Sequence, residues 1–357
     1  MKKRTIRSTY MEWAKLRSPA RYNLAASGVQ SCPLAELPVK LEDLEINGPN
    51  DYGYRPLVER LARKSGVAPE NVMETIGTSL ANHVAMASML EPGDEVLIER
   101  PTYSALVDVA EYLGAELRRF ERRFEDGYRI DPEEVKRQIT PRTRLIVITN
   151  LHNPSSAYTD EATLRALGEM AAQVGARVLV DEVYLEAMFE KAPKSAFHLG
   201  PNFIATSSLT KGYGLSGVRC GWVLADPELV ERMLQLNDLF MATAAHPAEL
   251  LSVIALDHLP KIAERAKKIL AANRAKAEIA LKDVEVFWPE HGTVIFPRVR
   301  QRDPEEFFKT LRETYETSVV PGRFFEAPQH FRVGLGGEPG MTAEGLERLA
   351  AALSSAN

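Results

Sequence analysis

Short apolar runs alternate with longer amphipathic stretches between about residue 72 and residue 225. The stretches between the runs, such as residues 161–170, repeat apolar positions at helical spacing. Apolar strands separated by helices indicate an α/β fold whose mainly parallel sheet is flanked by helices, and ligands of such sheets bind at the carboxyl ends of the strands. The runs predict buried strands at residues 96–98, 145–149, 178–180, 203–206 and 222–224.

The pattern changes in the last third of the chain. Residues 248–282 are rich in Ala and Lys and predict one long helix or two. Shorter elements follow at residues 284–287, 293–296 and 331–333, with a helix near 304–314. We therefore expect a smaller α+β domain here. The expected organisation is an N-terminal segment (1–45) that packs on the small domain, a large domain (46–255) and the small C-terminal domain (256–357).

Composition narrows the functional classes. The 357 residues carry a net charge of −5, which argues against the positive surface that nucleic-acid binding needs. The two cysteines, Cys32 and Cys220, suggest neither a disulfide framework nor a zinc site. The basic N-terminus lacks the apolar core of a secretory signal, and no apolar run approaches the ~20 residues of a membrane span. We expect a cytoplasmic protein that binds neither nucleic acid nor membranes, and no metal.

A glycine-rich segment, SSLTKGYGLSGVRCGW at residues 207–222, can be interpreted in two ways. Gly212, Gly214 and Gly217 form the pattern G-x-G-x-x-G, the fingerprint of a dinucleotide-binding turn. That turn requires a helix beginning at the third glycine, whereas residues 218–225 predict another strand. The pattern therefore disfavours a dinucleotide site.

Lys211 directly precedes these glycines, between Ser208 and Arg219. A hydroxyl and a guanidinium together can hold a phosphate, and glycines let the backbone approach a ligand closely. A lysine in a glycine-rich loop is usually only solvated. With a phosphate site beside it, however, its amine suggests a Schiff base to pyridoxal phosphate.

Three other segments carry groups that this cofactor needs. Asp181 ends a predicted strand and can hold the protonated pyridine nitrogen, although it could equally cap a helix. Tyr184 and Asn153 follow strands and can reach the phenolic oxygen, although an Asn-Pro pair is also common in turns. Thr78 and Ser79 open an apolar helix, where they could cap the helix and also hold a phosphate.

Two further residues stand out. Tyr103 follows the strand at 96–98 and could stack on the cofactor ring, although an aromatic residue there more often belongs to the core. Arg332 lies within an apolar strand pattern, and a buried arginine is costly unless it is paired. No acidic residue stands close to it in the sequence, so its partner is either a substrate carboxylate or an ion pair formed by the fold.

Together these motifs resemble those of fold-type I pyridoxal-phosphate enzymes of the class I/II aminotransferase family, over residues 22–350. The resemblance implies a large domain that binds pyridoxal phosphate and a ping-pong transfer of an amino group between an amino acid and a 2-oxo acid. Lyase, decarboxylase and amino-acid oxidase chemistry on the same fold are the alternatives. The matching segments are SLTKGYGLSGVRCGW (208–222), DEVY (181–184), N-x-x-NPS (150–155), PGDEV (92–96), PTY (101–103) and FRV (331–333).

The resemblance also implies residue roles. Lys211 would form the Schiff base and shuttle the proton, Asp181 would hold the pyridinium, and Tyr103 would stack on the ring. Family members are typically homodimers with the site at the subunit interface. The other implied contacts are Asn153 and Tyr184 to the phenolic oxygen, Thr78, Ser79, Ser208 and Arg219 to the phosphate, and Arg332 with the backbone near Gly28 to the substrate α-carboxylate.

The chain departs from the family pattern at two places. The turn N-P-T-G reads N-P-S-S here, so Ser156 replaces the glycine. The family tyrosine that reaches the partner subunit's phosphate corresponds to Gly48, and Tyr52 or Tyr54 could take its place. Arg332 implies only that the substrate has a carboxylate, and a neutral or aromatic amino acid is a mild preference.

Overall fold

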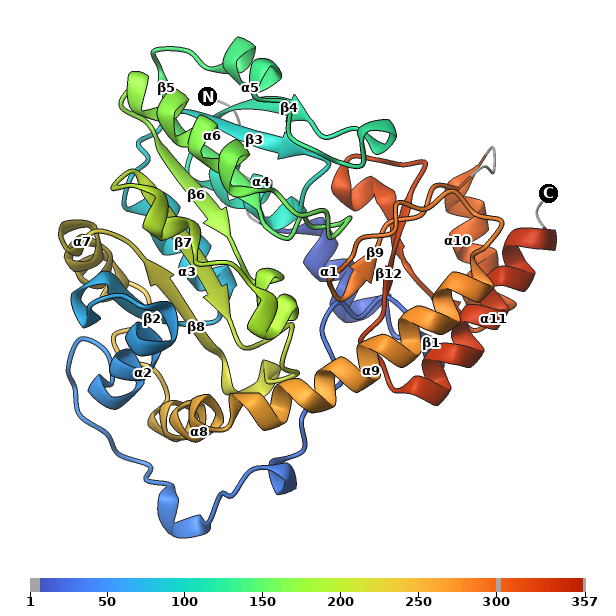
Figure 1. Cartoon of the computed structure of the whole chain (residues 1–357), viewed down its shortest axis with the longest axis horizontal. Helices are drawn as coiled ribbons and strands as arrows, with labels where there is room; N and C mark the ends of the chain where they lie inside the picture. Colours follow the sequence, from blue (N-terminus) through green and yellow to red (C-terminus); the bar gives the residue numbers. More distant parts are fainter. Residues whose placement is uncertain (1–6, 300–302, 356–357) are drawn as a thin grey trace.

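The computed structural model describes residues 7–299 and 303–355. A seven-stranded sheet with the order β2-β8-β7-β6-β5-β3-β4 forms its centre (Figure 1). β8 runs antiparallel to both of its neighbours and the other pairs are parallel, so the predicted mainly parallel sheet is confirmed. The strands are β2 (Val72–Ile76), β3 (Glu95–Arg100), β4 (Glu116–Glu121), β5 (Thr143–Thr149), β6 (Arg177–Asp181), β7 (Phe203–Ser208) and β8 (Cys220–Leu224).

Two of the seven strands, β2 and β4, were not among the predicted ones. β4 has the sequence ELRRFE, which contains no apolar run, and Phe120 is its only fully buried residue. β4 pairs with β3 alone and forms an edge of the sheet. An edge strand is open to solvent on the side that has no neighbouring strand, so polar residues are tolerated along it. A pattern of buried apolar strands therefore does not predict β4.

Helices cover both faces of the sheet because side chains alternate along each strand. Val96 and Ile98 point to the face that packs against α3 (Thr78–Ala87), α4 (Ser104–Tyr112) and α7 (Pro227–Asn237). Leu97 points to the opposite face. That face is covered by α2 (Arg55–Ser65), α5 (Pro132–Gln138), α6 (Glu161–Gln173) and α8 (His246–Asp257).

The C-terminal third forms a second core on one side of the sheet (Figure 1). Residues 248–282 form two helices, which separate at His258. Residues 284–287 form neither helix nor strand, although Val284 and Val286 pack against this core. The elements are α9 (Leu259–Ala280), β9 (Val294–Ile295), α10 (Pro304–Glu313), β10 (Thr317–Ser318), β11 (Val320–Pro321), β12 (Phe331–Gly334) and α11 (Pro339–Ser355), with β1 (Tyr22–Asn23) paired to β10.

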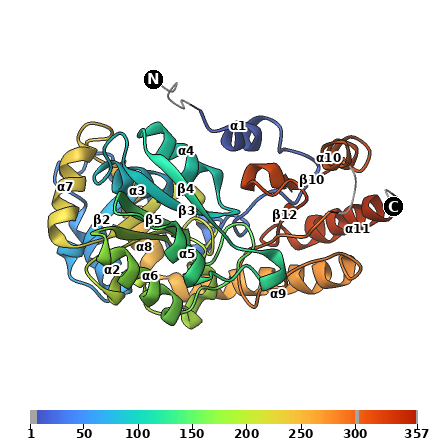
Figure 2. The same cartoon turned by 90° about the horizontal axis from the view of Figure 1, so that it is seen from above.

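The N-terminal helix α1 (Thr9–Leu16) lies over the junction between the two parts (Figure 2). Its Tyr10 ring makes edge contacts with Tyr103, just before α4, and with Phe324 in the C-terminal part, both at 5.6 Å between centroids. α1 thus covers the side of the sheet to which the carboxyl ends of β5, β6 and β7 point. Within residues 7–299 and 303–355, no helix has the length and apolarity needed to cross a membrane.

Candidate active site

A cavity of about 390 Å³ lies between α1 and the carboxyl ends of β5, β6 and β7. Every predicted site residue except Gly28 lines it, although these residues are spread from position 78 to position 332. The fold therefore gathers polar groups from both of its parts at one place. The predicted residues in the wall are Thr78, Ser79, Tyr103, Asn153, Asp181, Tyr184, Ser208, Lys211, Arg219 and Arg332.

Lys211 lies in the connection between β7 and β8. Only a short 3-10 turn (Ser216–Val218) precedes β8, so the segment lacks the helix that a dinucleotide-binding turn requires. The Lys211 Nζ donates a hydrogen bond to Ser27 Oγ at 2.8 Å. Burial lowers the pKa of Lys211, which favours the neutral amine and hence the nucleophilic form.

Asp181 is the last residue of β6 and is almost fully buried. It does not cap a helix: its Oδ2 accepts from Asn82 Nδ2 at 2.8 Å and its Oδ1 from the Val183 backbone at 3.1 Å. Asn82 in turn accepts from Thr206 Oγ1 at 2.6 Å, which fixes its orientation. Burial raises the pKa of Asp181 to about 6, so a cation placed against this carboxyl would be strongly favoured.

Thr78 and Ser79 are the first two residues of α3, but the residue that caps the helix is Gly77. The prediction that Thr78 or Ser79 caps α3 is therefore wrong. The Thr78 hydroxyl is buried and has no hydrogen-bond partner among the described residues. Arg219 donates to the Ile76 carbonyl at 3.0 Å, and its guanidinium packs so closely on Gly77 that a side chain there would overlap it. A helix N-terminus with hydroxyls and a guanidinium is well suited to a phosphate.

Arg332 on β12 is 1% exposed. Its Nη1 donates to Asn153 Oδ1 and its Nη2 to the Tyr10 hydroxyl, both at 2.8 Å. Its Nε is buried without a partner, and no carboxylate pairs with the guanidinium in the part of the chain that the structure describes. The ion pair considered as an alternative is not formed there. A buried guanidinium held by neutral groups is prepared to bind an anion.

The remaining predicted residues differ in how closely they match their expected positions. Tyr184 is buried in the wall, and the Tyr103 hydroxyl lies 3.4 Å from Met11 Sδ. The side-chain amide oxygen of Asn153 accepts from Arg332, an interaction that the sequence did not suggest. Gly28 lies behind the wall, where a side chain would press on the Thr210 carbonyl at 3.2 Å, and it is the neighbouring Ser27 that lines the cavity.

The residues that contact the predicted set and were missed include Tyr10, Ser27 and Asn82. Asn82 carried a usable signal, because a polar residue inside the apolar helix after Gly77 needs a buried partner. Tyr10 and Ser27 lie in a segment with weak periodicity. Their contacts with Arg332 and Lys211 depend on how the chain ends return to the sheet.

A buried ion pair supports this end of the sheet. Glu99 and Arg122 meet at 2.7 Å, and neither side chain is exposed. Glu99 also accepts from the backbone and the hydroxyl of Thr149, at 2.7 and 2.6 Å. The Thr149 hydroxyl accepts from the Asn153 backbone at 2.8 Å. The ion pair therefore holds the end of β5 and, through Thr149, the residue that contacts Arg332.

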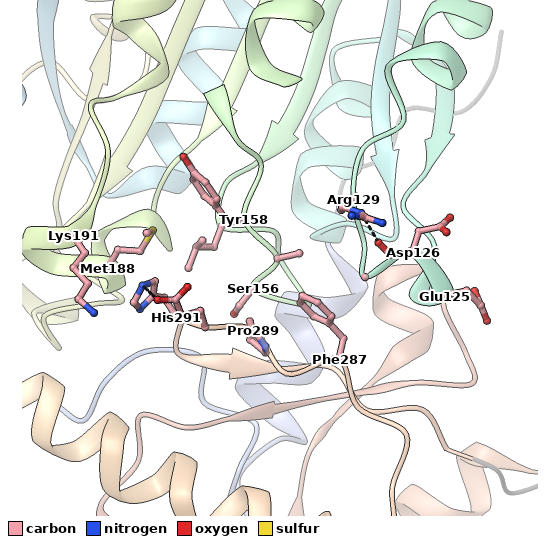
Figure 3. A pocket seen from close by; sticks show the side chains of 14 residues that line it. Glu125, Asp126, Arg129, Ser156, Tyr158, Met188, Lys191, Phe287, Pro289 and His291 are labelled. Atoms are coloured by element: carbon pink, nitrogen blue, oxygen red, sulfur yellow. Dashed lines mark hydrogen bonds and ion pairs between the residues drawn. The ribbon is translucent and has the colours of Figure 1, made fainter. Parts of the chain in front are cut away.

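A larger cavity, of about 770 Å³, is lined by Ser156 and Tyr158 of the loop 151–158 and by Phe287 and His291 from the C-terminal part (Figure 3). It contains none of the predicted site residues, and charges of both signs surround it, including Arg129, Asp126 and Lys191 (Figure 3). The smaller cavity is the better candidate because polar groups converge there on one point.

Ser156, in the wall of the larger cavity, stands where the family has glycine. It has a φ of 59°, a conformation that glycine adopts most easily. Its hydroxyl donates to the Val294 carbonyl at 2.8 Å, which links the loop to β9. Gly292 faces Ser156 so closely that a side chain at position 292 would overlap the hydroxyl.

The groups in the cavity wall suit pyridoxal phosphate. Asp181 can face a pyridinium, Lys211 can reach an aldehyde, and the unpartnered Thr78 hydroxyl with Arg219 can receive a phosphate. Fold and site thus define a fold-type I pyridoxal-phosphate enzyme.

Comparison with known proteins specifies the family. The model of the family described as aminotransferase class I and II matches residues 42–353. Arginine–pyruvate transaminase of Pseudomonas aeruginosa is 29% identical over 80% of this chain and 78% of its own length. Capreomycidine synthase of Streptomyces vinaceus is 28% identical over 90% of this chain and 87% of its own length.

A solved structure agrees with these relatives. The crystal structure of a PLP-dependent aminotransferase from Streptococcus suis has a TM-score of 0.92 and 30% identity, and covers 100% of this chain and 99% of the other. The chain belongs to the class I and II aminotransferase family, and it is a pyridoxal-phosphate-dependent aminotransferase. The lyase, decarboxylase and oxidase alternatives are not favoured.

Proposed function

We propose that the 390 Å³ cavity carries out the transamination between an amino acid and a 2-oxo acid, with Lys211 as base and Arg332 as carboxylate anchor. The observation that carries the proposal is that Arg332, buried and without an anionic partner among the described residues, lines the same cavity as Lys211 and Asp181. Bound pyridoxal phosphate supplies an aldehyde for the amino group and a ring that accepts electrons.

Side chains of the protein orient the substrate, move its proton and hold the cofactor ring. Arg332 orients the substrate by its α-carboxylate, with Asn153 and Tyr10 fixing the guanidinium. The Lys211 amine takes a proton from the substrate Cα, and its lowered pKa keeps a neutral base available. Asp181 keeps a proton on the pyridine nitrogen, while Asn82 holds the carboxyl in place.

Asp181→Asn tests the role of this carboxyl through pH. A carboxyl pKa raised to about 6 means that the folded, cofactor-free protein binds this proton more tightly than the unfolded chain, where the pKa is about 3.9. The resulting stabilisation is full below about pH 4 and is lost as the pH rises through 6. The difference in melting temperature between cofactor-free Asp181→Asn and wild type should therefore shift in favour of the variant as the pH is raised from 4 to 8.

In the cofactor-loaded enzyme the same substitution should lower activity, in contrast to the stability that it adds without the cofactor. Without the carboxylate that holds the pyridinium, we expect its kcat to fall by about 10²-fold or more, in the range of a lost acid–base group. Thermal melts of the cofactor-free protein and steady-state kinetics of the loaded protein measure the two effects. Unchanged kcat would remove Asp181 from the proposed mechanism.

We also propose that the enzyme works as a homodimer. Four large apolar side chains around the start of α3 and the loop after α7 are exposed: Tyr52 (59%), Ile76 (41%), Leu239 (77%) and Phe240 (54%). Tyr52 bonds Asp238 at 2.8 Å, and the Phe240 ring lies 5.4 Å from that of His83 on α3, so these segments adjoin. An apolar surface beside the phosphate end of the cavity supports an interface between two copies.

Tyr52 is the better candidate for the contact with the partner's phosphate. A side chain at Gly48 would overlap His246, so position 48 has no room for the family tyrosine. Tyr54 packs its ring 4.8 Å from His246, and its backbone donates to Glu74, whereas Tyr52 points outward. This supports Tyr52 over Tyr54.

Leu239→Glu tests the interface. A charge at the centre of an apolar interface should weaken dimerisation by about 100-fold or more. Ile279→Glu is the matched control, because Ile279 is similarly exposed, at 71%, but lies on α9. Analytical ultracentrifugation should show Leu239→Glu shifted towards monomer and Ile279→Glu unchanged. A wild-type monomer, or equal behaviour of the two variants, would contradict the proposal.

A further inference from the structure

Two buried carboxyl groups meet beside the sheet. Glu74 lies on β2 and Glu249 in the first turn of α8, and their side chains are joined by a hydrogen bond. Each residue is only 8% exposed within a single chain, so its burial does not depend on a partner subunit. Ionised carboxylates can only accept hydrogen bonds. A bond between two carboxyls therefore requires a proton on one of them.

Three further titratable residues lie next to the pair: His246, Tyr54 and Cys220. Glu249 meets His246 Nδ1 at 2.8 Å, and Glu74 accepts from the Tyr54 backbone at 3.1 Å. Burial raises the pKa of Cys220, on the neighbouring β8, to about 12, so its thiol stays neutral. Burial, followed by the hydrogen bond to Glu249 and its charge, raises the pKa of Glu74 to about 8. The shared proton is therefore held at neutral pH and lost in mildly alkaline solution.

The segment 48–54, which leads into α2, covers the pair. A side chain at Gly53 would lie 3.6 Å from the Glu74 side chain. The Tyr54 ring packs edge-on against His246, with 4.8 Å between centroids. The elements that this segment joins, α2, β2 and α8, lie together at one end of the sheet (Figure 1). The carboxyl pair and His246 thus form the surface on which the segment rests.

We propose that Glu74 and Glu249 share one proton that latches the segment 48–54 onto α8, and that loss of this proton releases the segment. Two negative charges in contact at a buried place repel each other, and the repulsion falls when water reaches them. β2 and α8 cannot easily separate, because Val72 and Ala255 pack them into one core cluster. Residues 48–52, in contrast, are exposed, so the covering segment is the part that moves.

The release affects the cofactor through Tyr52, which lies in this segment. Tyr52 is our candidate for the contact with the partner's phosphate, so this consequence rests on the proposed homodimer. A released segment no longer holds Tyr52 in place, which weakens the retention of the cofactor by the partner subunit. The latch thus makes cofactor retention depend on pH at a place remote from the reacting atoms.

The direction of the pH dependence follows from proton linkage. The seated segment keeps a proton on Glu74 that an exposed glutamate, with a pKa of about 4.3, gives up. The seated form is therefore favoured at low pH, and it loses this advantage as the pH rises towards 8. Between pH 6.5 and 8.5 the equilibrium should shift towards the released form by at least about tenfold.

Hydrogen–deuterium exchange of the cofactor-loaded protein, read by mass spectrometry over residues 48–54, tests the latch. Glu74→Gln keeps a hydrogen bond to Glu249 but has no proton to lose. The ratio of the exchange rates of wild type and Glu74→Gln cancels the chemical effect of pH on the amides. This ratio should rise at least about tenfold from pH 6.5 to 8.5, and a constant ratio overturns the latch.

The controls assign the titrating group. Glu95→Gln is the matched control, because Glu95 is also a buried carboxyl, 6% exposed, but is bonded to the Thr140 hydroxyl at 2.6 Å. The ratio of wild type to Glu95→Gln should stay constant. Glu249→Gln replaces Glu74→Gln should that variant fold poorly, because one amide is enough to remove the shared proton.

His246→Gln excludes the imidazole as the titrating group. Wild type and His246→Gln both carry the carboxyl pair, so the ratio of their exchange rates should stay constant with pH. A ratio that rises here, together with a constant ratio to Glu74→Gln, would place the titration on His246 and overturn the inference.

Cofactor loss separates the latch from the proposed dimer contact. From pH 6.5 to 8.5 the rate constant of cofactor loss should rise at least about threefold more in wild type than in Glu74→Gln. If the exchange ratio rises but both proteins lose the cofactor equally, or if wild type is a monomer, the latch is supported and the proposed role of Tyr52 is wrong.

Discussion

Lys211→Ala should lower the kcat of the loaded enzyme by at least about 10³-fold, within the range of a positioned acid–base group. The reason is positional: Nζ is held by Ser27 at 2.8 Å and lies in the same cavity as Arg332, which would fix the substrate carboxylate. A base in solution lacks both the lowered pKa and this fixed geometry.

A second readout separates covalent attachment from general damage. Borohydride should link the cofactor irreversibly to wild-type protein and not to Lys211→Ala, as mass spectrometry of the intact chain would show. Lys191→Ala is the matched control, since Lys191 lines the larger cavity behind the loop 151–158. Turnover of Lys211→Ala within tenfold of wild type would refute the assignment.

Arg122→Met should lower the free energy of unfolding by about 3–5 kcal/mol, the usual cost of removing one partner from a buried ion pair. Arg122 and Glu99 are both fully buried, and Arg122 also donates to the Tyr128 carbonyl at 2.6 Å. Methionine would leave the Glu99 carboxyl without its counter-charge, and burial already raises the pKa of this group. We expect Glu99 to take up a proton in the variant.

Urea unfolding of the cofactor-free protein measures the loss. Arg165→Met is the matched control, because Arg165 pairs with Glu161 at a similar 2.7 Å but both side chains are more than half exposed. That variant should lose no more than about 1 kcal/mol. Because Glu99 also holds Thr149 and hence Asn153, Arg122→Met should raise KM for the amino acid as well. A similar loss of unfolding free energy in Arg122→Met and Arg165→Met would show that the buried ion pair stabilises the protein no more than an exposed one.

The parts that the sequence predicted well are those fixed by local pattern. Asp181 ends an apolar run, Arg332 lies inside one, and Lys211 follows β7 by three residues, so their positions relative to the sheet follow from the strands themselves. The sequence placed Thr78 at the start of the correct helix but wrongly gave it a capping role. The residue that caps the helix is Gly77, which packs against Arg219 from the connection between β7 and β8.

The parts that were missed depend on tertiary packing. Tyr10 meets Arg332 across more than 300 positions of sequence, and no local pattern encodes that approach. β4 was missed because an edge strand needs little apolar surface. The Asn153–Arg332 contact required knowing that β12 comes to lie against the loop after β5.

The pairing of Ser156 with Gly292 shows that one position can be restricted in two ways. A side chain at position 292 would overlap the Ser156 hydroxyl, and the φ of +116° at this position is strained for residues other than glycine. Glycine is therefore favoured at position 292 whether position 156 holds serine or glycine. Ser156 thus adds its hydrogen bond to Val294, between the loop and β9, without imposing a new restriction on the residue opposite.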